Sequence, residues 1–231
     1  MAVTSGGSKY FLTPAGGYQT MKKVSISRNS NGTVLAVLMC TLVLSPGAVG
    51  AAEVPIGRAQ AVNANVLGTT TVLADTGTLV HETDARHNSL TEGSVAAPIT
   101  GELLNADVLH ATTTAGVDQV DSTASLADLA VSVVDILLGE IINVSAEFVR
   151  SEARAVSGGA VSGGAMIDGL FINGLLTVVT GEVNQIIPLV GGQVIINEHE
   201  SIPGGVRVNA LHIVIDGVAD LIIASSTAGL Q

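Results

Sequence analysis

The sequence predicts an all-β protein, an antiparallel β-sandwich or a related two-sheet architecture built from repeated hairpins. Short runs rich in Val, Ile, Leu and Thr alternate with Gly-containing turn signals along most of the 231 residues. Residues 206–230 contain both arms and the turn of one hairpin. A phrase from that hairpin recurs twice earlier in the chain.

The hairpin of residues 206–230 is centred on Asp216-Gly217, a dipeptide suited to a two-residue type I′ turn. Such a turn pairs Ile215 with Val218 and His212 with Leu221. One face of the hairpin is then apolar and includes His212. We therefore predict that His212 is a packed core histidine and not a ligand.

An internal repeat links three phrases, ASLADLAV at 124–131, AMIDGLFI at 165–172 and VRVNALHI at 206–213. Leu129, Leu170 and Leu211 lie at the same place in each phrase, 41 residues apart. They are predicted to be equivalent interior positions. The second phrase leads into Asn173-Gly174, another type I′ turn signal.

The chain is predicted to have three parts. Residues 1–20 are rich in Gly, Ser and Thr and are expected to be a non-native or disordered leader. Residues 21–52 form a signal peptide, with a basic start, an apolar core at 34–44 and small residues suited to cleavage near Ala51 or Ala52. This core is short of the ~20 residues that span a bilayer, so we expect a secreted, extracellular protein without membrane insertion. Residues 53–231 form a single all-β domain.

Within that domain the strands are expected to follow the alternating and β-branched runs. Residues 52–80 predict two or three short strands, 81–93 an exposed connection, and 99–114 a strand pair. Residues 125–148 have a capping-box-like start and an apolar stripe at helical spacing. Their Val and Ile content and the repeat register favour strands instead.

Turn signals divide the second half of the domain. The segment SGGAVSGG at 157–164 is predicted to be a flexible hairpin tip. Pro188 and Gly191-Gly192 indicate a turn between strands at 183–187 and 193–197.

The composition excludes several kinds of partner. Beyond residue 52 the chain has 20 acidic residues, five arginines and no lysine, which gives a formal net charge of −15. Such a surface repels nucleic acid and keeps a Val-rich β protein soluble. The scattered carboxylates leave divalent cations open as partners. Cys40, the only cysteine, lies in the predicted signal peptide, so the mature domain must be held by packing without disulfides.

Catalytic and cofactor motifs are absent from the sequence, so we predict that the protein is not an enzyme and has no cofactor. Phe148 and Phe171 are the only aromatic residues after residue 52, which argues against sugar or base stacking. His81 and His87 are the only candidate metal ligands, on a segment with Glu82 and Asp84. A zinc site needs three or four convergent ligands, so no metal site is predicted.

The C-terminal part resembles a known family. The ending VIINEHES at 194–201, the hairpin GGVRVNALHIVIDGVADLIIASSTAGL at 204–230 and the repeated phrases are similar to the bacterial choice-of-anchor extracellular domains, most closely the P type. The resemblance implies a secreted β domain whose relatives carry different C-terminal sorting tails. This chain ends at Gln231 without a sorting motif, so covalent anchoring is not expected.

Together these features predict a secreted, non-enzymatic structural or adhesive module of the bacterial cell surface or extracellular matrix. Its expected partners are further copies of itself or cell-envelope components. Unprotected strand edges would pair with other strands once salt or calcium screens the negative charge. The alternative is a secreted small-ligand or metal-binding protein.

Overall fold

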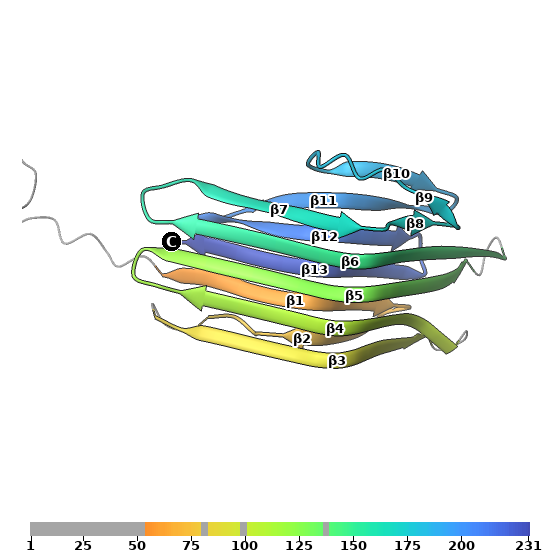
Figure 1. Cartoon of the computed structure of the whole chain (residues 1–231), viewed down its shortest axis with the longest axis horizontal. Helices are drawn as coiled ribbons and strands as arrows, with labels where there is room; N and C mark the ends of the chain where they lie inside the picture. The colour runs from red at the N-terminus through yellow and green to blue at the C-terminus, as the bar shows by residue number, and fades with distance from the viewer. Residues whose placement is uncertain (1–53, 80–82, 98–100, 136–138) are drawn as a thin grey trace, which may run out of the picture. The chain divides into compact units, whose positions relative to one another are not determined.

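Two antiparallel β-sheets of six and seven strands face each other in the computed structural model (Figure 1). The model describes residues 54–79, 83–97, 101–135 and 139–231, which belong to one compact unit, Gly50–Gln231, and contain no helix. The predicted all-β, sandwich-like architecture is confirmed. No helix in these ranges has the length and hydropathy needed to cross a membrane. The predicted leader and signal peptide, residues 1–52, lie outside the described residues.

The six-stranded sheet combines the start and the end of the domain. Its strand order is β10-β11-β12-β13-β1-β2, so the last strand pairs with the first. The strands are β1 (Pro55–Val66), β2 (Thr69–Asp75), β10 (Gln185–Leu189), β11 (Gly192–Ile202), β12 (Gly205–Ile215) and β13 (Ala219–Leu230).

The seven-stranded sheet is made by the middle of the chain. Its order is β3-β4-β5-β6-β8-β9, and β7 also pairs with β6. The strands are β3 (Ala85–Ala97), β4 (Gly101–Ala115), β5 (Gln119–Asp135), β6 (Glu140–Val156), β7 (Val161–Asp168), β8 (Phe171–Ile172) and β9 (Leu175–Leu176).

The core lies between the sheets. β13 packs across β5 and β6, β1 across β4 and β5, and β12 across β6 and β7. The buried side chains are almost all Val, Ile, Leu and Ala, as the scarcity of aromatic residues predicts. Two buried hydroxyl contacts also join the sheets, Ser151 to Ser226 at 2.7 Å and Thr76 to Thr113 at 3.3 Å.

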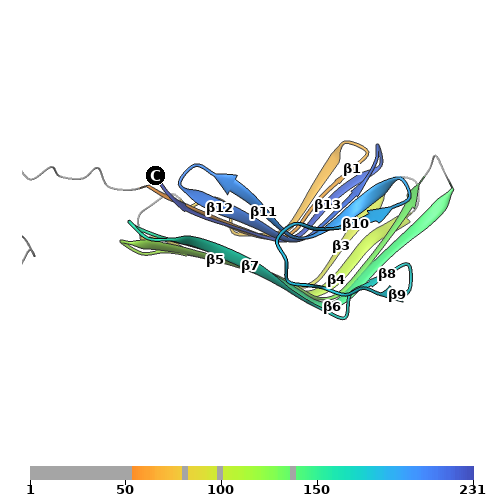
Figure 2. The same cartoon turned by 90° about the horizontal axis from the view of Figure 1, so that it is seen from above.

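Both sheets bend halfway along their strands (Figure 2). In the six-stranded sheet Ala74, Ala224 and Asn197 have positive φ angles of 48°, 51° and 52°. The residue pairs on either side of these positions show which residues lie opposite one another. Ala61 of β1 lies between Ala74 and Ala224. Ala210 of β12 lies between Ala224 and Asn197. The left-handed residues therefore form one row across the sheet. Such residues change the direction of a strand in the way that a β-bulge does.

The seven-stranded sheet has a matching row. Val108 of β4 and Asp128 of β5 have φ angles of 49° and 48°, and Gly169 follows β7 with 62°. The register between β4 and β5 shifts on either side of Asp107. A bend shared by the two layers keeps them in contact along their length.

The repeated leucines lie next to the bend. Leu129 and Leu170 follow the left-handed Asp128 and Gly169, and Leu211 follows Ala210, which lies opposite Ala224 and Asn197. The three leucines are 2%, 1% and 0% exposed. Their predicted interior position is confirmed. The alternation of inward and outward side chains also shifts here, because Val208 and Leu211 both face the core although they are three residues apart.

The predicted register of the C-terminal hairpin is wrong by one residue. Ile215 pairs with Ala219 and His212 with Ile222, because the loop has three residues, 216–218. Val218 donates its N–H to the Ile215 carbonyl at 3.0 Å, and Gly217 supplies a φ of 69°. A three-residue loop with one left-handed residue is the next most common hairpin loop after the two-residue type.

Three other expectations need correction. Residues 85–93 of the predicted connection belong to β3. This strand lies at the edge of the sheet and most of its side chains are exposed, so its sequence lacks the alternation of apolar and polar residues that identifies a strand. Residues 101–114 of the predicted strand pair form one strand, β4. Only 157–160 of the predicted tip are a turn, because β7 begins at Val161.

Other expectations are confirmed. Most of residues 125–148 is strand, in β5 and β6. Asn173 and Gly174 have the positive φ angles of a type I′ turn, 50° and 75°, and join β8 to β9. The predicted turn between β10 and β11 is present at residues 190–191, but Pro188 lies within β10 and Gly192 begins β11.

Candidate functional site

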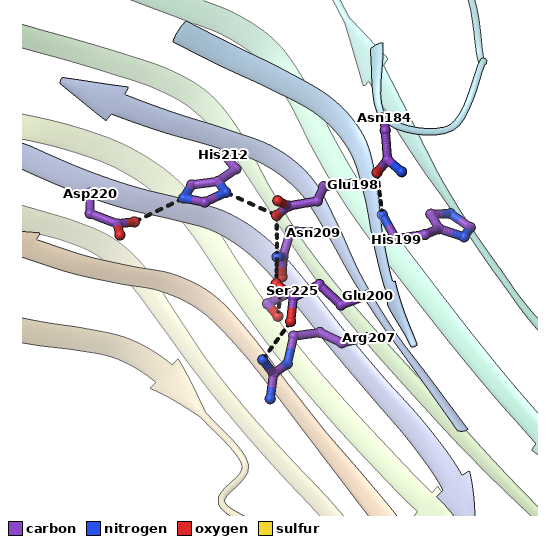
Figure 3. A network of polar contacts seen from close by, with 9 residues as sticks. All are labelled: Asn184, Glu198, His199, Glu200, Arg207, Asn209, His212, Asp220 and Ser225. Atoms are coloured by element: carbon purple, nitrogen blue, oxygen red, sulfur yellow. Dashed lines mark hydrogen bonds and ion pairs between the residues drawn. The ribbon is translucent and has the colours of Figure 1, made fainter. Parts of the chain in front are cut away.

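A polar network lies on the outer face of the six-stranded sheet, inside its bend (Figures 2 and 3). Three neighbouring strands supply its side chains. These are Glu198 and Glu200 of β11, Arg207, Asn209 and His212 of β12, and Asp220 and Ser225 of β13.

His212 lies between two carboxylates. Its Nδ1 is 2.9 Å from Glu198 Oε2 and its Nε2 is 2.9 Å from Asp220 Oδ1. Only 15% of the His212 side chain is exposed. The two ring nitrogens therefore link β12 to both of its neighbours. The predicted core position of this histidine is wrong, because the register and the bend together place it on the outer face.

The two carboxylates change the titration of His212. Burial opposes the charged imidazolium, but the hydrogen bonds and charges of Glu198 and Asp220 outweigh it and raise the pKa of His212. In turn, the hydrogen bond from His212 lowers the pKa of Glu198 against the effect of burial. The pair therefore favours a charged imidazolium beside a charged carboxylate.

Asn209 connects Glu198 of β11 to Ser225 of β13 next to the bend. Its side-chain nitrogen donates to Glu198 Oε2 at 2.7 Å, and its oxygen accepts from the Ser225 hydroxyl at 2.7 Å. Arg207 pairs with Glu200 at 2.9 Å. Asn209 is fully buried although it faces outward, since side chains on the inside of a bend converge.

The geometry of the network is that of a structural clamp. The Ser225 hydroxyl donates to Asn209 and not to His212, so the histidine does not activate it as a nucleophile. Sequence periodicity could not reveal this network. Asn209 and His212 are three residues apart and would face opposite sides of a regular strand.

A smaller polar cluster lies beside the clamp, where β11 meets the loop before β10. Asn184 accepts the backbone N–H of His199 at 2.8 Å (Figure 3), and Asn197 Oδ1 lies 3.0 Å from His199 Nε2. Burial lowers the pKa of His199. The cluster fixes the loop, since Asn197 also donates to the Gly181 carbonyl at 3.2 Å.

The two histidines considered as metal ligands are not both described. His81 lies outside the described residues. His87 is on β3, with its Nδ1 3.2 Å from the Thr112 hydroxyl and its ring 5.4 Å from that of His110. Across the four described ranges, no group of three or more His, Cys, Asp and Glu side chains is placed to hold a metal ion.

An apolar border lies where β9 ends one sheet and β10 begins the other (Figures 1 and 2). Its members are exposed by 37% to 74%: Phe171, Leu175, Leu176, Val178, Val183 and Ile186. Glu182 is the one charged residue in the segment 169–197, and Asp128 and Glu147 lie beside Phe171 at one side of the border. An exposed group of large apolar side chains is typical of a surface that binds a partner.

No protein-family model, curated protein or solved structure matches this chain. The similarity to choice-of-anchor domains therefore stays a prediction that rests on the quoted residues.

Proposed function

We propose that the protein is an exported, non-enzymatic structural or adhesive module that assembles with further copies of itself through the apolar border. The observation that carries this proposal is the exposure of Leu175, Leu176 and Val178 by 73%, 69% and 74%. The signal-peptide pattern of residues 21–52 supports export.

The charge distribution supports a second copy as the partner. Two domains that each carry about 15 negative charges repel one another over most of their surfaces. Within the segment 169–197, which supplies the border, Glu182 is the only charged residue, so this segment adds little to the repulsion. A two-fold symmetric dimer places the same patch against itself, so one apolar surface is sufficient.

Side-chain packing is better suited to this contact than extended strand pairing. β9 has two residues, and Pro188 of β10 lacks an N–H group. Short edge strands and edge prolines both disfavour strand addition. The buried apolar area of Leu175, Leu176 and Val178 would then stabilise the dimer.

Sedimentation velocity of the domain 53–231 at increasing sodium chloride concentration tests the proposal. Salt screens the repulsion between copies, so the dimer fraction is expected to rise as the Debye length falls from ~30 Å at 0.01 M to ~8 Å at 0.15 M. A parallel series in calcium chloride tests whether divalent cations raise the dimer fraction more than sodium does.

Two variants locate the contact. Leu176→Glu should abolish the increase of the dimer fraction with salt, because a dimer would bury two added charges. Val117→Glu is the matched control, since Val117 is 78% exposed in the turn between β4 and β5. A monomer at every salt concentration, or equal effects of the two variants, would contradict the proposal.

A further inference from the structure

An open hollow lies on the outer face of the seven-stranded sheet, over β5, β6 and β7. It has a volume of about 470 Å³. A second hollow of about 170 Å³ adjoins it and shares Arg150 and Glu152. Apart from the buried Ser122, the polar side chains around the larger one are Asp121, Thr123, Arg150, Glu152, Arg154 and Ser162. We propose that this hollow binds an acidic polysaccharide, a chain of sugars that carry carboxylates.

The hollow exists because β7 presents almost no side chains here. Gly164 pairs with Glu152 of β6, and a Cβ at Gly164 would meet no atom within 4 Å. Ser162 and Met166 border this gap along the strand. A longer side chain at residue 164 would fill the space between them.

The arginines of the hollow have hydrogen-bond donors to spare. Arg150 donates one bond, from its terminal nitrogen to Glu152 at 3.0 Å. Its Nε is buried without a partner, so the terminal N–H groups of the side chain, which is 43% exposed, are the donors open to a ligand. Arg154 donates to Gln119 at 2.9 Å and lies 3.5 Å from Asp121. A guanidinium has five N–H donors and binds carboxylates in a bidentate way.

The alternation of positive and negative side chains along β6 favours a ligand that carries both carboxylates and hydroxyl groups. Arg150, Glu152 and Arg154 share one face of the strand, so the two arginines are ~13 Å apart with a carboxylate between them. Glu152 would repel a ligand that is only anionic. A sugar acid offers carboxylates to the arginines and hydroxyl donors to Glu152, Thr123 and Ser162.

This recognition needs no aromatic platform. Stacking on Trp or Tyr faces is the common way to hold neutral sugars, and the described chain has neither residue. Charge-assisted hydrogen bonds from arginine provide another source of affinity, about twice as strong as neutral ones. The hollow also holds two of the five arginines beyond residue 52, in a domain that is otherwise strongly acidic.

Isothermal titration of the domain 53–231 with a galacturonic acid hexamer tests the proposal. Binding is expected at low salt and should be lost with the methyl-esterified hexamer, which keeps the hydroxyls and lacks the charges. Arg150→Gln and Arg154→Gln should each weaken binding about tenfold, and Gly164→Leu should weaken it without a change in charge. The matched control is Arg58→Gln, whose arginine pairs with Asp75 on the other sheet and should not affect binding.

The outcomes separate this proposal from self-association. Titrations at a protein concentration where sedimentation shows a monomer make the result independent of the apolar border, and thermal melts confirm that each variant is folded. Absence of binding, equal binding of the esterified hexamer, or equal losses for Arg150→Gln and Arg58→Gln would overturn the proposal. Equal binding of a glutamate hexamer would overturn it in favour of an acidic peptide.

Discussion

His212 shows how a single residue depends on both sheet register and strand bending. The alternating apolar pattern of β12 predicts an inward-facing histidine, and a two-residue turn would pair it with Leu221. The three-residue loop moves its partner to Ile222, and the bend at Ala210 turns its side chain to the polar face. Period-two patterns do not show where a strand changes direction, so the clamp around His212 could not be predicted from the sequence.

The His212 clamp should make the stability of the domain depend on pH. The pKa of His212 is raised in the folded state, so its contribution is complete below the usual value of 6.5 and is lost as the pH rises through the folded value. The pKa of Glu198 is lowered, so its contribution is present above about 4.5 and is lost as the pH falls through the folded value. The contribution of this pair to the free energy of unfolding is therefore greatest between about pH 4.5 and pH 6.5.

Urea denaturation from pH 5 to pH 9 measures this dependence. The wild type should lose stability between pH 6 and pH 9, and His212→Gln should lose less. His110→Gln is a suitable control, since His110 pairs with Ser89 on β3, in the other sheet. Parallel pH profiles for the wild type and His212→Gln would show that the clamp does not titrate in this range.

At the scale of strands, the positions of turns and β-branched runs predict most of the elements. The type I′ turn at Asn173-Gly174 and the strands of 125–148 follow from them directly. β3 was missed because an edge strand with charged and polar residues on both faces lacks the alternation that identifies a half-buried strand. The bend rows were missed because Ala and Val are not residues that normally indicate a positive φ.

Two alanines of the bend allow a direct test of its backbone strain. Ala61 and Ala224 face each other across β1 and β13 and are both fully buried, but only Ala224 has a positive φ. Replacing either by Gly removes the same methyl group. Ala224→Gly should be less destabilising than Ala61→Gly by about 1 kcal/mol, because Gly pays no steric cost in the left-handed region.

Chemical denaturation of the two variants in parallel provides the comparison. Equal losses of unfolding free energy would mean that the left-handed conformation of Ala224 stores no strain.

At the scale of the domain, the sequence predicts two packed sheets because alternating and β-branched runs are separated by turn signals along most of the chain. It does not predict the strand order. The pairing of β13 with β1 joins residues about 160 positions apart, and local patterns carry no information on such contacts. β9 and β10 are the edge strands of two different sheets and lie at the same border of the molecule (Figure 1), and both Leu175 and Ile186 are exposed there.

Hydrogen exchange of the wild-type domain, measured by mass spectrometry at low and high protein concentration in 0.15 M salt, tests the central claim most directly. A dimer formed through the apolar border should slow exchange in peptides that cover residues 171–189 as the concentration rises. Peptides from β3, Ala85–Ala97, at the opposite edge of the seven-stranded sheet should exchange at the same rate in both samples. Slower exchange in β3 alone, or no concentration dependence in residues 171–189, would contradict assembly through this border.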